Sequence, residues 1–593
     1  MNQKSIAVLP FENISSDLEN EYFADGVTEE IINALSQVEG LKVTARTSSF
    51  SYKGKKEDVR KIGNQLGVST VLEGGIRKAG KRIRISAQLI RTDNGFQIWS
   101  ESFDRELNDI FELQDEISLH IADRIRENYG HLEIADHLAK KPTENLQAYD
   151  LYLRGRFNHL KWNREGIENG MRFYEESIRE DPQFAHPYFG IAFCYAMYGS
   201  WIKRPELLDL AEDYIQKGFA IDSQSDLGYF AKATLEFWGR WNFIEGEKSY
   251  HKAIALNSSN SEAMEGLAEL YIAIGYFEKA KEQTERALRV NPISANHLFT
   301  MGDILYMQNH IEQALSYFDA SLRADRYFEH AIAYKQLVLI QLGHKDRLES
   351  FMETYDGRPD NVLCRALFAV MHPDLSTEIS KEEALQLAVE SEEIGLIGWK
   401  LYLLAHLGKK AEALRFLENV VRNKEGQYIN FSHMPLLEPL QSEQSYHDLV
   451  NRVFSPAFLP DKSGRLYQAE PEKKALMGEG EIESVSEKLD SLMDKEKAYL
   501  NPSLSLRDLA EMLELGSNKL SWYLNEILGQ SFSEFINGRR IEEFKTRAKD
   551  ENYAHLSLLG LALESGFNSK SVFNDNFKKA TGSTPSNWLK ENR

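Results

Sequence analysis

The hydrophobic positions change their spacing along the chain. In residues 1–135, short apolar runs alternate with stretches in which apolar residues recur every three or four positions. The runs predict strands at 5–11, 41–46, 70–78, 82–91 and 96–103, and the periodic stretches predict helices at 21–38, 58–66 and 112–127. Residues 146–455 and 484–593 show the helical spacing almost throughout. The fold class predicted is multidomain, a small mixed-sheet α/β domain followed by all-α regions.

The helical region at 146–455 is repetitive. Gly246, Ala280 and Ala314 lie 34 positions apart. The unit at 261–294 resembles a tetratricopeptide repeat, with small residues where two helices cross, aromatics between them and Pro292 at the end. About eight such helix pairs are expected to stack into an α-solenoid with a concave groove. The groove suits peptide binding or self-association, and its many aromatic residues are expected to pack between repeats rather than to cage a ligand.

Residues 456–483 interrupt this pattern with glycine, proline and charge, which predicts a linker. The domain at 484–593 then carries two copies of helix, turn and helix, joined by one helix at 532–549. In the first copy, Gly516 is expected to form the turn and Ser517 to cap the second helix, at 518–528. In the second copy, Gly566 is expected to form the turn and Ser569 to cap the second helix. Two such helices at fixed separation suit duplex DNA, whose major grooves recur about every 34 Å along one face.

The residues on the outer faces of these two helices are the candidates for base contacts. Asparagine can pair with adenine through two hydrogen bonds, serine can donate or accept, and tryptophan can press on a thymine methyl group. The predicted base-reading set is Asn518, Ser521, Trp522 and Asn525 on the first helix, and Lys570, Ser571, Asn574 and Asp575 on the second. The predicted phosphate-contacting set is Lys519, Arg539, Arg540, Lys545, Lys578 and Lys579. For the basic residues near Glu542 and Glu543, a solvated or ion-paired face is an equal alternative.

The charge of the chain restricts where nucleic acid can bind. The net charge is −21, but residues 486–593 hold 15 Lys and Arg against 16 Asp and Glu. Nearly all of the negative charge therefore precedes the C-terminal domain, and it repels phosphate. DNA binding is expected to be confined to that domain and to depend on specific contacts.

Catalytic and metal-binding motifs are missing from the sequence. It contains no HExxH, GxxxxGK[ST], GxSxG or CxxC motif, and the 15 histidines are scattered. We therefore expect no enzyme activity, no metal and no cofactor. Cys194 and Cys364 are expected to be buried free thiols. Since no apolar run reaches the ~20 residues of a membrane helix, we expect a cytoplasmic protein without membrane contact.

Two resemblances to known families extend this interpretation. The segments AVLPFENISSDLENEYFADGVTEEI and RISAQLIRTDNGFQIWSESFDRELNDIFELQDEI resemble the TolB-type domain of bacterial regulators, which implies a sensory or assembly role. Within it, Pro10, Asn13, Arg46 and Ser48 at strand ends could bind a ligand, although turn hydrogen bonds and an ion pair are the favoured alternative.

The C-terminal domain resembles the AraC/XylS family of bacterial transcription regulators, through SLRDLAEMLELGSNKLSWYLNEILG and GFNSKSVFNDNFKKATGSTPSNW. The resemblance implies base contacts from positions 518, 521, 522, 570, 571, 574 and 575. Asp575 and Trp522 depart from the residues usual there, so the second helix is expected to contribute mainly backbone contacts.

The sequence thus predicts an AraC-type regulator that binds promoter or operator DNA. Its domains are expected at 1–135, 146–455 and 484–593, with the linker at 456–483. The first two are expected to sense a signal or partner and to control self-association. The alternative is a non-catalytic tetratricopeptide scaffold whose helix-turn-helix end docks a protein.

Overall fold

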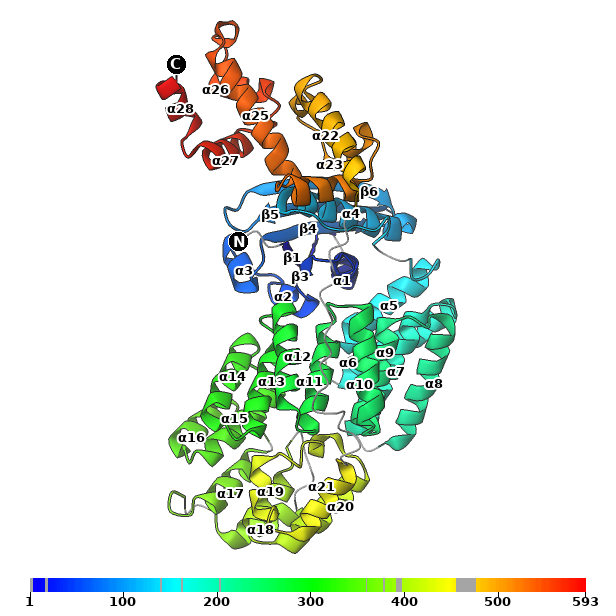
Figure 1. The fold of residues 1–593 in the computed structure, drawn as a ribbon. Coiled ribbons are helices and arrows are strands. Elements are labelled where there is room, and N and C mark those ends of the chain that lie inside the picture. Colours follow the sequence, from blue (N-terminus) through cyan, green and yellow to red (C-terminus); the bar gives the residue numbers. More distant parts are fainter. Residues whose placement is uncertain are drawn as a thin grey trace.

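The computed structural model describes residues 4–15, 20–80, 82–138, 141–160, 164–201, 204–358, 360–376, 379–390, 397–454 and 476–592. Three regions follow one another in space (Figure 1). The α/β domain lies in the middle, the helical solenoid packs on one side of it, and the C-terminal helices pack on the other. The fold class expected from the sequence is confirmed.

The α/β domain is built on one mixed sheet with the order β3-β1-β4-β5-β6, and β2 also pairs with β4. Strand β1 runs parallel to β3 and β4, whereas β4, β5 and β6 form an antiparallel meander. Turns with glycine in the left-handed region, at Gly80 and Gly95, close its two hairpins. The strands are β1 Ser5–Val8, β2 Glu12–Asn13, β3 Lys42–Val43, β4 Thr70–Ala79, β5 Arg82–Arg91 and β6 Gln97–Glu106.

Alternation along the strands gives the sheet two buried faces. Ile6 and Leu72 belong to the large core under α1 (Glu21–Ser36) and α4 (Ile110–Tyr129). Their neighbours Ala7 and Val71 face a smaller core, formed with α3 (Val59–Leu66). The sequence missed two short elements, β2 and α2 (Arg46–Phe50), because neither is long enough to show a period.

The solenoid contains eight consecutive helix pairs in its described part, from α5 and α6 to α19 and α20, as the 34-residue spacing predicts. Buried residues of α9 to α21 form one continuous core, in which Trp241 is buried and Trp238 packs against the rim, as expected for aromatics between repeats. The helices are α5 Leu146–His159, α6 Arg164–Glu180, α7 Ala185–Trp201, α8 Pro205–Ile221, α9 Asp226–Thr234 with the π-turn η3 Leu235–Gly239, α10 Phe243–Leu256, α11 Ser261–Ala273, α12 Phe277–Val290, α13 Ala295–Met307, α14 Ile311–Ala324, α15 Glu329–Gln341, α16 Lys345–Thr354, α17 Asn361–Met371, α18 Lys381–Glu390, α19 Trp399–His406, α20 Lys410–Arg422 and α21 Gln444–Val453, with 3-10 turns η4 Gly426–Tyr428 and η5 Pro435–Leu440.

The α/β domain and the solenoid are joined by a shared core. The cluster beneath the sheet continues into Tyr152, Tyr174 and Phe184 of the first repeats. On the far side, the Ala45 N–H donates to the Val290 carbonyl at 2.8 Å, and the buried Ser48 hydroxyl bonds to Asn291. These two domains therefore form one packed unit.

Three of the candidate ligand-binding residues of the α/β domain, Asn13, Arg46 and Ser48, have partners within the protein. Ser48 Oγ also accepts from the Ile293 N–H at 3.1 Å, and Arg46 pairs with Glu29 at 3.2 Å. Asn13 accepts from the Ser15 N–H at 3.0 Å, within its own turn. The contacts of Asn13 and Arg46 match the alternative favoured from sequence, a turn hydrogen bond and an ion pair, whereas Ser48 bonds to the solenoid and not within a turn.

Cys194 and Cys364 are free and buried, as expected. Burial raises the pKa of the Cys194 thiol to about 12, so both its burial and its protonation disfavour reaction. Within the part of the chain that the structure describes, no helix combines the length and apolar character needed to span a bilayer.

Candidate nucleic-acid interface

The C-terminal domain contains two helix-turn-helix units. The first is α23 with α24 and the π-turn η8, and the second is α26 with α27. The elements are α22 Glu479–Asp494, η7 Ala498–Leu500, α23 Leu506–Met512, α24 Ser517–Trp522, η8 Tyr523–Ile527, α25 Phe532–Lys549, η9 Glu551–Tyr553, α26 Leu558–Glu564, α27 Lys570–Thr581 and α28 Pro585–Asn592. Most of the predicted linker lies at 455–475, outside the described residues.

Helix α25 holds the two units together. Its first half places Phe532 and Ile536 in the core of the first unit. Its second half places Ile541 and Phe544 in the core of the second. A capping box fixes its start, because Ser531 and Glu534 satisfy each other's backbone N–H groups. One rigid helix with the bounds expected from the sequence therefore sets the spacing of the two units.

The turn of the first unit differs from the sequence prediction. Glu514 takes the left-handed conformation, with φ of 58°, whereas Gly516 has an ordinary φ of −72° and serves as the N-cap. Ser517 is the first residue of α24 and makes no side-chain cap. The prediction was wrong here because glycine is the usual residue at a positive φ, and nothing in the sequence marks a glutamate for that part.

The turn of the second unit follows the prediction. Gly566 has a φ of 94°, and the Ser569 hydroxyl caps α27 by accepting from the Val572 N–H at 3.3 Å. Gly582 ends α27 in the left-handed conformation. Phe573 and Phe577 are fully buried and fix which face of α27 points outward.

The four candidate base-reading residues of the first unit are covered by the α/β domain or by their own domain. The Asn518 side chain accepts from Arg126 Nη1 at 2.5 Å and donates to the Ile134 carbonyl at 3.1 Å. Ser521 is 2% and Trp522 9% exposed. Asn525 donates to the Ser521 carbonyl, and a Cβ on Gly130 would lie 2.9 Å from its Oδ1. In this arrangement the first reading helix faces α4 and the residues after it.

The second reading helix, α27, is more open. Lys570, Ser571 and Asp575 are exposed and Asn574 is half-buried. Asp575 Oδ2 accepts a hydrogen bond from Asn94 Nδ2 at 3.2 Å. Asn94 lies in the turn between β5 and β6, so α27 also contacts the α/β domain. Asp575 is one of the two positions that depart from the AraC pattern, and this contact gives its carboxylate a partner.

Most of the candidate phosphate contacts are ion-paired on the surface. Lys519 pairs with Glu481 at 2.6 Å, Lys545 with Glu542 at 2.7 Å, and Lys579 with Glu534 at 2.9 Å. Arg539 pairs with Asp494 at 2.8 Å, while Lys578 is exposed. Exposed pairs of this kind are worth little and exchange readily for phosphate.

Arg540 differs from the other basic candidates because it is buried. Its guanidinium donates to the carbonyls of Tyr499 and Asn501, each at 2.8 Å, and burial lowers its pKa to about 10. The contact that the structure gives Arg540 is thus with the chain that precedes α23, and its role there is structural.

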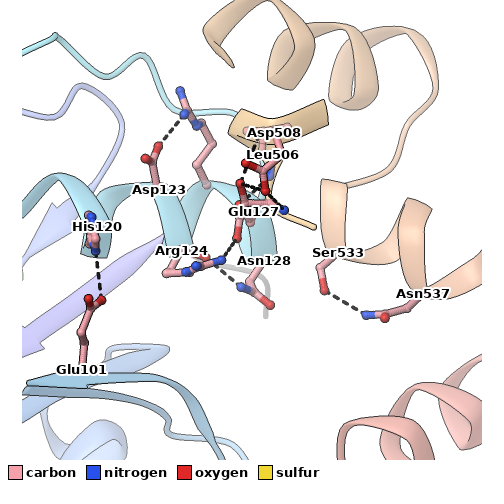
Figure 2. A network of polar contacts seen from close by, with 12 residues as sticks. Glu101, His120, Asp123, Arg124, Glu127, Asn128, Leu506, Asp508, Ser533 and Asn537 are labelled. Carbon is pink, nitrogen blue, oxygen red and sulfur yellow. Dashed lines mark hydrogen bonds and ion pairs between the residues drawn. The ribbon is translucent and has the colours of Figure 1, made fainter. Parts of the chain in front are cut away.

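Sequence reasoning missed the residues of the α/β domain that meet the reading helices. Figure 2 shows Glu127 of α4 between Arg124 and the start of α23, where its carboxylate accepts from the Leu506 N–H at 2.8 Å. Burial raises the pKa of the Glu127 carboxyl and lowers that of the Arg126 guanidinium. The adjacent charged residues Arg126 and Glu127 near the end of an amphipathic helix were the available signal, but nothing in the sequence identifies the partner of Glu127, 379 residues away.

Two family models match separate parts of the chain. Residues 2–119 match the model described as HilA/YgeH-like transcriptional regulator, second domain. Residues 509–591 match a helix-turn-helix domain of the AraC type. Together these domains support a DNA-binding regulator. Neither match confirms the TolB-type resemblance, which stays a prediction.

Two curated relatives share parts of the chain. A protein named putative adenylate cyclase 3, from Rhizobium meliloti (strain 1021), is 40% identical over 241 residues, which are 40% of this chain and 40% of that protein. An uncharacterized HTH-type transcriptional regulator, SAS0078 of Staphylococcus aureus (strain MSSA476), is 31% identical over 102 residues, 17% of this chain and 13% of the relative. The chain thus spans less than half the length of these relatives.

Among solved structures, one described as the functional characterization of Pseudomonas aeruginosa pilF is similar at 17% identity with a TM-score of 0.29. It covers 38% of this chain and 99% of that one. No group of three or more residues that could hold a metal ion occurs among the described residues.

Proposed function

We propose that this chain is a sequence-specific transcription regulator of the AraC type, in which both helix-turn-helix units read one DNA site. The supporting observation is the fixed pair of reading helices: α24 and α27 are set on separate cores at the two ends of α25. A rigid spacer of this kind lets two helices enter successive major grooves of one duplex. The alternative of a tetratricopeptide scaffold needs no such spacing.

Within this proposal, the first helix specifies the sequence. Asn518 and Asn525 can each form two hydrogen bonds with adenine, Ser521 can donate or accept, and Trp522 can contact a thymine methyl group. The second helix carries Lys570, Lys578 and Lys579 for the backbone, while Ser571 and Asn574 can reach bases. Asp575 can accept only from a cytosine amino group there.

Replacement of Asn518 by alanine in the full-length chain is expected to reduce the discrimination between bases at its position in the DNA site by about tenfold to a hundredfold, because a bidentate adenine contact is worth about 1–3 kcal/mol. Trp522→Ala is expected to do the same, provided that the domain stays folded. Chromatin occupancy mapped across the genome measures both variants in cells. Asn423→Ala, at an exposed position after α20, is the matched control.

If neither Asn518→Ala nor Trp522→Ala changes occupancy, the base-reading assignment is wrong and the scaffold alternative is favoured. Circular dichroism of each purified variant separates loss of contact from loss of fold. This check matters most for Trp522, because its ring belongs partly to the core of the first unit.

We also propose that the α/β domain, with its TolB-type resemblance, and the solenoid sense a signal or a protein partner and control self-association in the cytoplasm. Their shared core supports this role, because a partner bound in the solenoid groove would act on the α/β domain directly. The acidic charge of these regions supports a role away from DNA.

The chain is proposed to lack cyclase activity, although one relative is named a putative adenylate cyclase. The support is the absence from the sequence of the catalytic motifs sought and the regulator descriptions of both matched families. Purified full-length chain incubated with ATP and Mg²⁺ is expected to form no cyclic AMP above buffer alone. Product formation that is lost on heating the protein would contradict this.

A further inference from the structure

Both reading helices contact the α/β domain, at two separate places. Asn518, at the start of α24, is held by the Arg126 guanidinium and by both the N–H and the carbonyl of Ile134. Asp575 of α27 is held by Asn94, in the β5–β6 turn. Position 518 and position 575 belong to the two base-reading sets, so the α/β domain bonds to one reading residue from each.

The contact at α24 excludes DNA for steric reasons. The major groove is about 12 Å wide and an α-helix with its side chains measures about 10–12 Å across, so a reading helix fills the groove. In this structure α4 and the segment ending at Ile134 occupy the side of α24 that would face the base edges. Helix α25 also contacts α4, and Figure 1 shows the C-terminal helices rising from this side of the α/β domain. The α/β domain and a duplex cannot occupy that face together.

The interface between the α/β domain and the C-terminal domain is polar. In this it differs from the junction between the α/β domain and the solenoid. The buried residues of the first and second helix-turn-helix units form cores of their own, and neither core includes a residue of the α/β domain. By contrast, the sheet and the first repeats share one core. The C-terminal domain can therefore leave α4 with both of its cores intact, at the expense of hydrogen bonds that water can replace.

The interface is also incompletely filled. A cavity of about 920 Å³ lies between α4 and the first unit, and its lining includes Asp123, Arg126, His137, Ser505 and Asn518. Tight permanent interfaces are packed as densely as protein interiors, so α4 and the first unit are not close-packed along this part of their contact.

We infer that the structure holds the C-terminal domain in a masked state, in which α4 with the segment up to Ile134 and the β5–β6 turn occupy the base-reading faces, so that DNA competes with the chain's own α/β domain. The inference rests on the proposed function. It adds that the α/β domain is the competitor of DNA and that the base-reading faces of α24 and α27 are the surface for which the two compete. It also accounts for Asp575, because a carboxylate that is poorly suited to DNA is suited to the Asn94 amide and to the nearby Arg91.

Masking reduces the apparent affinity for DNA, which equals the affinity of the open form multiplied by the fraction of molecules that are open. A variant that weakens the contact without touching a reading residue should therefore bind DNA more tightly. Asn94→Asp is suited to this, because aspartate can keep the acceptor that bonds the Phe96 N–H while it sets a second carboxylate against Asp575. Arg126→Met removes the donor to Asn518 and keeps an apolar stem of similar length.

The experiment uses full-length protein and a duplex selected from a randomised library in two parallel selections, one with the unsubstituted chain and one with the double variant Asn94→Asp/Arg126→Met. The double variant is expected to bind this duplex at least about tenfold more tightly than the unsubstituted chain. The added negative charge and the lost positive charge would by themselves weaken binding to DNA, so tighter binding reports release. Asn64→Asp, on the exposed side of α3, is the matched control and should bind like the unsubstituted chain.

The outcomes distinguish the inference from the proposed function. If no duplex is enriched by either protein, the proposed function fails. If a duplex is enriched and both proteins bind it equally, the masking inference is overturned while the function stands.

A second measurement needs no substitution. Adding the selected duplex to the unsubstituted chain should speed hydrogen exchange at the Ile134 and Leu506 amides, whose partners are Asn518 and Glu127. Unchanged or slower exchange at both amides in the DNA complex would overturn the masking inference even if the variants misfold.

Discussion

Replacing Gly566 by alanine is expected to destabilise the second helix-turn-helix unit by about 3 kcal/mol or more. Its backbone has a φ of 94°, and an added Cβ would lie 2.4 Å from the Tyr499 carbonyl oxygen and 2.9 Å from the Leu500 Cα. Both are backbone atoms, which no change of rotamer can move away. The strain and the clash add, and they act where Phe567 enters the core of this unit.

The measurement for Gly566→Ala is hydrogen exchange in α26 and α27, because a chain of several domains does not unfold in one step. Faster exchange is expected at the amides of Ser565 and Phe567, which bond to Leu561 and Ala562. DNA binding should fall with it. Gly516→Ala is the matched control, since that glycine has a φ of −72° and no atom within 4 Å of an added Cβ. Equal exchange in the two variants would contradict the argument.

Replacing Asp303 by asparagine is expected to stabilise the solenoid at alkaline pH. Asp303 lies on α13 and is 5% exposed, with no hydrogen-bond partner for its Oδ1. Burial raises its pKa from 3.8 to about 7. The folded state therefore prefers the protonated acid, and the stability that this provides is fully present below about pH 4 and is lost as pH rises through about 7.

The size of this effect follows from the shift in the Asp303 pKa. Each pKa unit corresponds to about 1.4 kcal/mol, so up to about 4 kcal/mol separates the two ends of the pH range. The gain from Asp303→Asn should be near zero at pH 4 and largest above pH 8, in the free energy of opening obtained from hydrogen exchange at the amides of α13. Asp346→Asn, at an exposed position on α16, controls for the loss of one negative charge. A gain that does not vary with pH would contradict the assignment.

Local features of the fold could be predicted from the sequence because each depends on a few neighbouring residues. The bounds of α25, the Ser569 cap and the left-handed Gly566 all follow from capping and turn chemistry. The same reasoning predicts the turn of the first unit at Gly516, but Glu514, two residues earlier, takes the left-handed conformation.

The position of the reading helices against the α/β domain could not be predicted. The contacts join residues 379 to 481 positions apart, and they are hydrogen bonds of a few polar side chains that nothing in the sequence marks as buried. Periodicity identifies which face of a helix is apolar, but it carries no information about which polar face meets which. The outer helix faces and the AraC/XylS resemblance therefore predict the base-reading residues, but neither predicts the partners that Asn518 and Asp575 have in the structure.

The polar contact between Asn518 and α4 lies within a single polypeptide, and this decides how it responds to protein concentration. Two segments tethered in one chain meet at an effective concentration set by the tether, commonly in the millimolar range. Dilution of the protein or a change in its expression leaves the closed fraction unchanged. A molecule that binds the open and closed forms unequally, such as DNA or a ligand of the α/β domain, shifts that fraction by its difference in affinity for the two forms.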